Sequence, residues 1–512
     1  MATLLAGALV LSASQLAAQQ APLSAIDWLS QSVAPPVVPP RLSEPPVTGT
    51  AEIPQIIVTP LDGPSLDRLG LYAPSQTGLP PDLWAASPSE LIVTLVQASR
   101  SESLPAMQEL SALLMAAQAA PPLGAGPQST LYFARVDKLL DLGLLDMAQA
   151  LLAEAQLNGN NAQEPARFRR SFDIALLTGT EDAACAQMQS RPDMAPTLPA
   201  RVFCLARNGD WQAAALTLNT ARVLGDVTDE EEELLSRFLD PALADGAPRL
   251  PPPERLSPLV FRLREAIGEA MPTAALPLAF AHADLRPSIA WRYQLEAVER
   301  LARTGAVPDE EYLRIFLDRT PAASGGIWDR AAAIQRLDQA INARDPQAAA
   351  TALLPTWEAM KTARTELVFA RLYAARLSRL KLPAELQDLS FQLTLLTPDY
   401  ESAALGIGPA SGEVGFLAGL ARGNLEQTVA TTPKQAAILA GFSNPTLPAA
   451  LTALTDAGRL GEALLRAISI FNQGFSGDPA ALSDALALLR SVGLEDVARR
   501  TALQYLLLER QS

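Results

Sequence analysis

The sequence predicts an all-α fold of antiparallel helical hairpins, stacked as an irregular α-solenoid after an extended Pro-rich N-terminal segment. The main observation is a recurring phrase in which Gly follows Leu after four residues and Ala follows Gly after five. It occurs at Leu139-Gly143-Ala148, Leu205-Gly209-Ala214, Leu454-Gly458-Ala463 and Leu489-Gly493-Ala498. Composition agrees: 49% of the residues are hydrophobic and only 5% are aromatic, which suits close helix packing better than a β-sheet.

Each phrase lies between two apolar stretches of helical period, which is the pattern of a helical hairpin. The Leu packs at the end of the first helix. The Gly closes that helix because its backbone can turn left-handed without a Cβ clash. The small Ala allows the second helix to lie close against the first. Stacked hairpins of this kind form solenoids, whose usual work is binding.

The N-terminus, residues 1–18, is expected to be a signal peptide. An apolar run from Leu4 to Leu11 is followed by small residues, and the run is too short to span a bilayer. Cleavage near Ala18 would leave a periplasmic or secreted protein. One departure is that no Lys or Arg occurs before Arg41. The alternative is a buried apolar N-terminal helix.

Residues 19–86 are expected to form an extended Pro-rich tail and a wrapping segment. The stretch 34–46 reads APPVVPPRLSEPP, which favours polyproline II. Before it, Ile26, Trp28 and Leu29 form an apolar island that could be a docking peptide or could pack on the chain's own helices. Residues 53–59 could form one short strand.

From residue 87 onward the pattern is helical almost throughout. We expect helices over 89–99 and 104–119, and then hairpins that pair 130–142 with 145–157, 165–177 with 181–190, and 197–207 with 210–224. The expected organisation is a group of hairpins over 87–225, irregular helical repeats over 226–444, and C-terminal hairpins over 445–512.

The hairpin phrase resembles the turn and small-residue positions of tetratricopeptide repeats. Gly458 and Gly493 are 35 residues apart, close to the roughly 34 residues of that repeat. In two units a further Ala, Ala155 or Ala221, stands where that family's second helix prefers one. Residues 225–450 keep no full phrase. The resemblance implies a degenerate tetratricopeptide-repeat-like solenoid of an exported bacterial protein, with binding as its role.

Cys185 and Cys204 are expected to form a disulfide. They fall on neighbouring predicted helices, and an even number of cysteines in an exported chain favours a bridge. The alternative is a pair of buried free thiols in a cytoplasmic protein. A metal site is not expected, because two Cys and the single His282 at these spacings make no known ligand set.

Net charge and the absence of known motifs narrow the classes of partner and cofactor that the chain is expected to bind. A net charge of −15 disfavours nucleic acid and anionic membrane surfaces as partners. No stretch downstream of the signal reaches the length of a membrane span, and no phosphate loop or dinucleotide fingerprint is present. The acidic run 229–233 after Thr228 is typical of a capped helix start. We therefore expect no catalytic residue and no cofactor.

The function expected is a non-enzymatic scaffold of the cell envelope that holds a protein or peptide partner on a solenoid surface. One alternative is a structural envelope protein without a discrete groove. Another is a cell-wall enzyme similar to lytic transglycosylases, since Glu401-Ser402 matches their Glu-Ser pair. The Gly-Leu-Met-Gln stretch that should follow it is absent. The sequence leaves the oligomeric state open.

Overall fold

The computed structural model describes residues 65–157, 163–426, 428–443, 447–475 and 477–508. Over these residues the chain is helical and contains no β-strand; two isolated bridges join Tyr72 to Ala117 and Pro88 to Leu123. The predicted all-α class is confirmed for this part of the chain. The signal peptide, the Pro-rich tract, the possible strand over 53–59 and the island of Ile26, Trp28 and Leu29 lie outside the described residues.

The helices follow one another along the chain with short connections. The first group comprises α2 (Pro74–Thr77), α3 (Ser89–Ala98), α4 (Pro105–Ala116), α5 (Thr130–Asp141), α6 (Leu145–Leu157), α7 (Glu164–Thr178), α8 (Glu181–Ser190), α9 (Leu198–Arg207), α10 (Trp211–Leu224), α11 (Asp229–Leu239) and α12 (Pro258–Ala266). The second comprises α13 (Trp291–Ala302), α14 (Asp309–Leu317), α15 (Ile327–Asn342), α16 (Pro346–Ala363), α17 (Glu366–Leu377), α18 (Gln387–Leu395), α19 (Tyr400–Gly406), α20 (Gly412–Arg422), α21 (Pro433–Ser443), α22 (Ala449–Asp456), α23 (Leu460–Phe475), α24 (Pro479–Ser491) and α25 (Glu495–Leu507). Short 3₁₀ turns are η1 (Leu66–Arg68), η2 (Pro192–Met194), η3 (Pro241–Leu243), η4 (Thr273–Ala275), η5 (Leu278–Leu285) and η6 (Ala384–Leu386).

The Leu-Gly-Ala phrase closes a helix in the same way each time. Its glycine has a φ between 69° and 87°, and the next amide donates to the carbonyl oxygen of the phrase's Leu. These bonds run from Leu144 to Leu139 at 2.8 Å, from Asp210 to Leu205 at 3.0 Å, from Arg459 to Leu454 at 2.9 Å and from Leu494 to Leu489 at 2.8 Å. The alanines are all fully buried: Ala148, Ala214, Ala463 and Ala498. The predicted hairpin geometry is therefore observed at every phrase.

Within residues 226–444, arginine twice takes the place of this glycine. Arg344 (φ 53°) and Arg364 (φ 56°) adopt the left-handed conformation. The amide of Asp345 donates to the carbonyl oxygen of Ala340 at 3.1 Å, and that of Thr365 to Met360 at 3.0 Å. The same turn thus continues where the phrase is lost, with Ala340 and Met360 in the place of its Leu.

Arg344→Gly and Arg364→Gly should each raise the free energy of unfolding by about 0.5–1 kcal/mol. The left-handed conformation costs a residue with a Cβ more than glycine loses in chain entropy, and both arginines are exposed. Urea denaturation measures the change. Arg336→Gly is the control: Arg336 is exposed in the middle of α15, where glycine should destabilise by about 1 kcal/mol. A loss of stability in all three variants would contradict the prediction.

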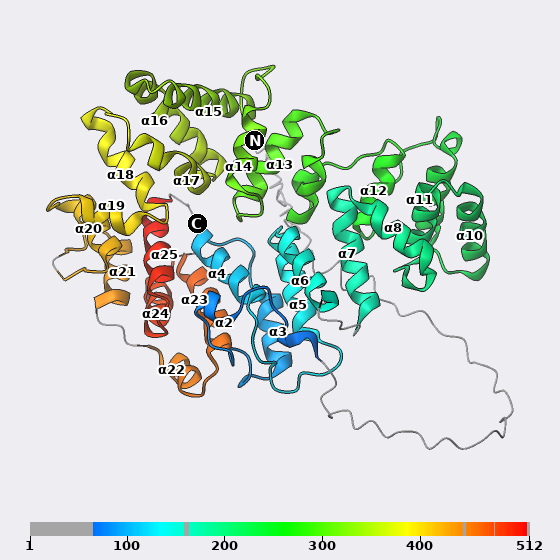
Figure 1. The fold of residues 1–512 in the computed structure, drawn as a ribbon, viewed down its shortest axis with the longest axis horizontal. Helices are drawn as coiled ribbons and strands as arrows, with labels where there is room; N and C mark the ends of the chain where they lie inside the picture. The colour runs from blue at the N-terminus through cyan, green and yellow to red at the C-terminus, as the bar shows by residue number, and fades with distance from the viewer. Residues whose placement is uncertain (1–64, 158–162, 427, 444–446, 476, 509–512) are drawn as a thin grey trace, which may run out of the picture.

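The main body closes on itself, because the first and last helices pack together. Figure 1 shows α3 and α4 beside α23 and α25, and these pairs are in contact. The Gly461 amide of α23 donates to the Leu83 carbonyl oxygen at 3.0 Å, and Gln504 Oε1 of α25 accepts from the Ala106 amide at 2.8 Å. We call this contact between residues 79–109 and 460–508 the seam.

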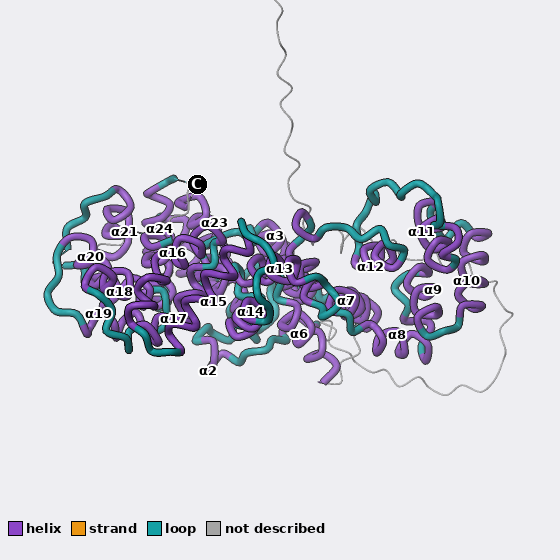
Figure 2. The backbone as a smooth tube through the Cα atoms, turned by 90° about the horizontal axis from the view of Figure 1, so that it is seen from above, coloured by secondary structure: helices purple, strands orange, loops and turns teal. Residues whose placement is uncertain are grey.

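Helices α7 to α12 form an arm on one side of the body (Figures 1 and 2). The arm has its own hydrophobic cluster, which includes Phe172, Leu176, Phe203 and Leu235. Its last helix, α12, returns to pack on its first, α7, and η5 then contacts α5, α7 and α13 of the adjoining body. The arm is therefore a side loop of helices that leaves and rejoins the ring.

Candidate functional site

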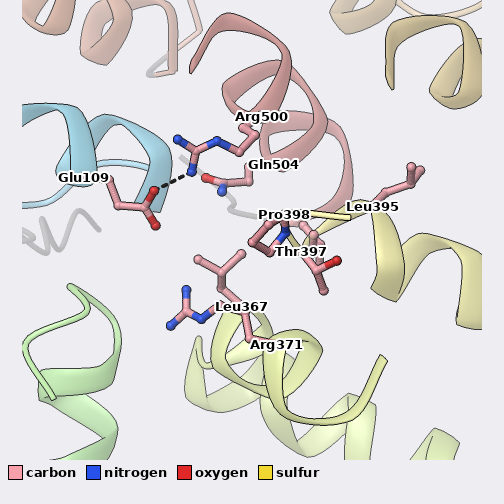
Figure 3. A pocket seen from close by; sticks show the side chains of 9 residues that line it. Glu109, Leu367, Arg371, Leu395, Thr397, Pro398, Arg500 and Gln504 are labelled. Carbon is pink, nitrogen blue, oxygen red and sulfur yellow. Dashed lines mark hydrogen bonds and ion pairs between the residues drawn. The ribbon is translucent and has the colours of Figure 1, made fainter. Parts of the chain in front are cut away.

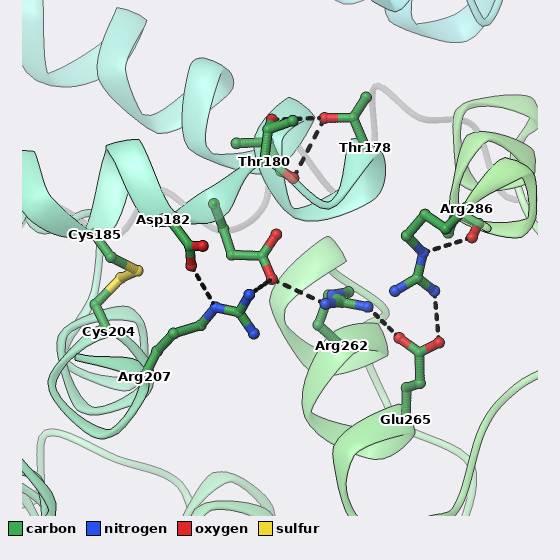
Figure 4. Close-up of polar contacts among 12 residues, drawn as sticks. Thr178, Thr180, Asp182, Cys185, Cys204, Arg207, Arg262, Glu265 and Arg286 are labelled. Atoms are coloured by element: carbon green, nitrogen blue, oxygen red, sulfur yellow. Dashed lines mark hydrogen bonds and ion pairs between the residues drawn. A yellow bond between two sulfur atoms is a disulfide. The ribbon is translucent and has the colours of Figure 1, made fainter. Parts of the chain in front are cut away.

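A disulfide joins the first two hairpins of the arm, α7 with α8 and α9 with α10. Cys185 on α8 and Cys204 on α9 are bonded, with their Cα atoms 5.0 Å apart, and both are buried. They are the partners that the sequence predicted. Figure 4 shows the bridge beside a chain of charged residues that leads from the arm toward the body.

This chain of ion pairs is centred on Glu181, whose side chain is fully buried. Its Oε1 lies 3.3 Å from Arg207 of α9 and 2.9 Å from Arg262 of α12. Arg262 also pairs with Glu265, which in turn accepts from Arg286 at 2.5 Å, just beyond η5 (Figure 4). The network thus fixes how the arm meets the body. Removing one member of a buried pair leaves its partner uncompensated.

Cys185→Ala and Cys204→Ala should each lower the free energy of unfolding by about 3 kcal/mol, since the bridge closes a loop of 19 residues in the unfolded chain. Urea denaturation of oxidised protein measures the loss, and the double variant should lose no more than either single one. Thiol labelling of the denatured, unreduced wild type should find no free sulfhydryl. Two labelled thiols would contradict the prediction.

Helix α10 carries four exposed large apolar side chains. The exposed fractions are 49% for Trp211, 69% for Leu216, 82% for Val223 and 67% for Leu224. Leu216 and Val223 are seven residues apart and so lie along one side of the helix. Trp211, at the N-terminal end of the helix, instead lies against Phe238 of α11, with the ring centroids 6.0 Å apart. We call Leu216, Val223 and Leu224 the α10 face.

The α10 face is neutral and outward-facing. The opposite side of α10 packs into the arm through Ala214, Leu218 and Ala221, which are buried. The only charged residue of the helix, Arg222, lies 3.3 Å from Glu232 of α11. Figures 1 and 2 both place α10 at the outer end of the arm. Large exposed apolar patches rimmed by polar residues mark interaction sites.

A small pocket lies where the first, middle and last parts of the ring meet. It has a volume of about 110 Å³. Four segments line it: α4, α17, the end of α18 with the loop that follows, and α25 (Figure 3). The lining residues are Glu109, Leu367, Arg371, Leu395, Leu396, Thr397, Pro398, Arg500 and Gln504.

The two arginines of the pocket are held by carboxylates. Arg371 makes two bonds of 2.6 Å to Asp309 of α14. Arg500 donates to Asp496 at 2.9 Å, and its other bond crosses the seam to Glu109 of α4. Burial and these partners act on both pKa values in opposite directions, and the carboxylates leave the pKa of each guanidinium raised. Both side chains therefore remain cationic and fixed in place.

The other sequence candidates lie away from this pocket. His282 Nε2 donates to the Gly143 carbonyl oxygen at 2.7 Å, and burial lowers the pKa of the imidazole. Glu401 is half exposed and lies 3.5 Å from Arg499, while Ser402 Oγ donates to the Asp399 carbonyl oxygen. These three side chains thus act in local packing and surface pairing.

The acidic run is a helix start, as predicted. Thr228 and Glu231 form a reciprocal capping box at the beginning of α11: the Glu231 amide donates to Thr228 Oγ1 at 3.2 Å, and the Thr228 amide donates to Glu231 at 2.9 Å. Among the residues that the structure places, no group of three or more potential ligands is arranged to hold a metal ion. None of the described helices is long and apolar enough to cross a membrane.

Comparison of the chain with protein-family models, with curated proteins and with solved structures finds no match. Function must therefore be inferred from the chain's own surfaces. Sequence analysis identified neither the α10 face nor the pocket. The seven-residue spacing of Leu216 and Val223 was a sequence signal for the α10 face. For the pocket there was none, because it is assembled from four distant segments.

Proposed function

We propose that the protein is an exported, non-enzymatic scaffold of the cell envelope that holds a protein or peptide partner on an α-solenoid surface. The observation that carries the proposal is the α10 face. Helix α10 exposes four large apolar side chains, Leu216, Val223 and Leu224 together with Trp211 at its N-terminal end, and no other described helix exposes as many. Buried aromatic and apolar anchors supply most of the binding energy at protein interfaces.

Three further observations support the proposal. The disulfide between Cys185 and Cys204 is typical of an oxidising compartment. The repeated Gly-closed hairpins are typical of solenoids, whose exposed helices serve as binding surfaces. The net charge of −15 makes nucleic acid a poor partner. The partner proposed is accordingly a protein or peptide with an apolar surface.

A pair of matched variants tests the proposal. Leu216→Glu/Val223→Glu places two charges on the α10 face, whereas Leu405→Glu places one on α19, where the native Leu is 68% exposed, as Leu216 is 69% exposed. Purified protein is used to capture partners from an envelope extract, with quantification by mass spectrometry. We expect the double variant to lose partners at least tenfold, because the charges must be buried on binding. The Leu405→Glu variant should retain them.

Equal capture by all three proteins would show that the α10 face is not the binding surface. Capture of no partner by the wild type would favour a structural envelope protein. Cell fractionation supplies the second test: the disulfide-bonded protein should occur with periplasmic or secreted proteins. Reduced protein confined to the cytoplasm would contradict the envelope role.

A further inference from the structure

We propose that the pocket at the centre of the ring binds a carboxylate attached to a small apolar group. The ligand would be a free short-chain acid or the C-terminal residue of a peptide. The proposal goes beyond the scaffold function and depends on other residues than the α10 face. It rests on spare hydrogen-bond donors, an apolar wall and the position of Glu109.

Three side chains bring unused donors to the pocket (Figure 3). Arg371 donates to Asp309 through Nε and Nη2, and its Nη1 makes no hydrogen bond with the described residues. Arg500 likewise uses Nε and Nη1 and leaves Nη2 without such a partner. Gln504 Oε1 accepts a hydrogen bond from the Ala106 amide, and its Nε2 makes no hydrogen bond within the described chain. Guanidinium and amide donors suit a carboxylate.

The donors are held before a ligand arrives. Asp309 fixes the plane of Arg371 with its two bonds, and Asp496 fixes Arg500 along the same helix. Gln504 is 3% exposed and is tied to the start of α4. A ligand would therefore meet groups that have already lost their rotational freedom, which favours binding.

The rest of the lining is apolar except for Thr397, whose hydroxyl donates to the Thr394 carbonyl oxygen, and it limits the size of the ligand. Leu367 comes from α17, and Leu395, Leu396 and Pro398 come from the end of α18 and its loop. A volume of about 110 Å³ holds several waters or one small organic group. Sites of this kind pair an apolar surface with a few placed polar groups. The ligand should thus be a carboxylate with a short aliphatic tail.

Glu109 lines the pocket and pairs with Nη1 of Arg500, beside the spare Nη2 that a ligand would use. Its carboxylate is bonded to Arg500 across the seam, and its side chain is 45% exposed. It can turn into solvent at little cost, whereas Asp309 (21% exposed) is more enclosed. Exchange of one carboxylate for another leaves the local charge unchanged. Glu109 is therefore a competitor of the ligand, and its neutralisation should strengthen binding.

Isothermal titration calorimetry with sodium butyrate and with butyramide provides the test. We expect the acid to bind and the amide not to bind, and the affinity for the acid should fall with added salt. Glu109→Gln should tighten butyrate binding about fivefold, as expected from the loss of one partly exposed ion-pair competitor. Arg371→Gln should weaken it at least tenfold. Arg376→Gln is the control, since Arg376 lies on the same helix, pairs with Asp338 and does not line the pocket.

N-acetyl-alanyl-leucine and its C-terminal amide distinguish the two sources. Binding of the peptide acid above butyrate assigns the site to a chain terminus, and binding of butyrate alone assigns it to a free acid. If Arg371→Gln does not fold, Glu109→Gln decides by its sign, because a purely structural Glu109 would not tighten binding. Equal binding of acid and amide, no binding of any probe, or weaker binding by Glu109→Gln overturns the proposal. Leu216→Glu/Val223→Glu should bind butyrate normally, so failure of the scaffold function would be seen separately.

Discussion

Arg135→Met should lower the free energy of unfolding by about 3 kcal/mol. The Arg135 side chain is fully buried in α5, and burial lowers its pKa to about 10. Its guanidinium donates to four backbone carbonyl oxygens, those of Asp67, Leu69, Met115 and Ala117, at 3.2, 2.8, 2.7 and 2.9 Å. Methionine fills much of the space but leaves these acceptors without a donor.

The loss of stability is expected to be smaller than the summed cost of four unpaired carbonyl oxygens, because the variant also removes a buried charge. Guanidinium chloride denaturation measures it. Arg336→Met is the matched control: Arg336 is exposed on α15, and its replacement should change stability by less than about 0.5 kcal/mol. Similar stability for the two variants would show that the Arg135 bonds contribute little.

Gly461→Val should destabilise the protein by about 3 kcal/mol and loosen the seam. A Cβ at Gly461 would lie 2.5 Å from two ring carbons of Trp84 and 2.7 Å from the Leu83 carbonyl oxygen. Trp84 is fully buried, so neither neighbour can move without opening the contact between α23 and the start of the ring.

Thermal unfolding measures the loss, and small-angle X-ray scattering should show a larger radius of gyration. Gly406→Ala is the control, because a Cβ there meets nothing within 4 Å. A variant at Gly461 with native stability and native dimensions would refute the importance of this close approach.

The local structure could be predicted from the sequence to a greater extent than the tertiary contacts. The phrase at Leu139-Gly143-Ala148 specified a hairpin because helix closure depends on a few neighbouring residues. Arg344 and Arg364 adopt the same turn with no sequence signal, because arginine is not a residue type that favours the left-handed conformation. The resemblance to tetratricopeptide repeats and the solenoid stacking stay predictions.

The seam could not be predicted for a different reason. Ser87 contacts Glu462, and Ala106 contacts Gln504, across sequence separations of 375 and 398 residues. Nothing in either local stretch identifies the other. The pocket inherits this difficulty, because Glu109 and Arg500 meet only when the ring has closed. The α10 face would have been easier to predict from the sequence, since its apolar residues lie on one helix.

Closure of the ring sets a delay in biosynthesis. The Ala106 amide has its acceptor in Gln504, which is synthesised 398 residues later. At the roughly 5–20 residues per second of translation, that is about 20–80 s during which α3 and α4 lack their contacts with α23 and α25. The first helices of the ring are thus natural clients for a chaperone until the last hairpin is complete.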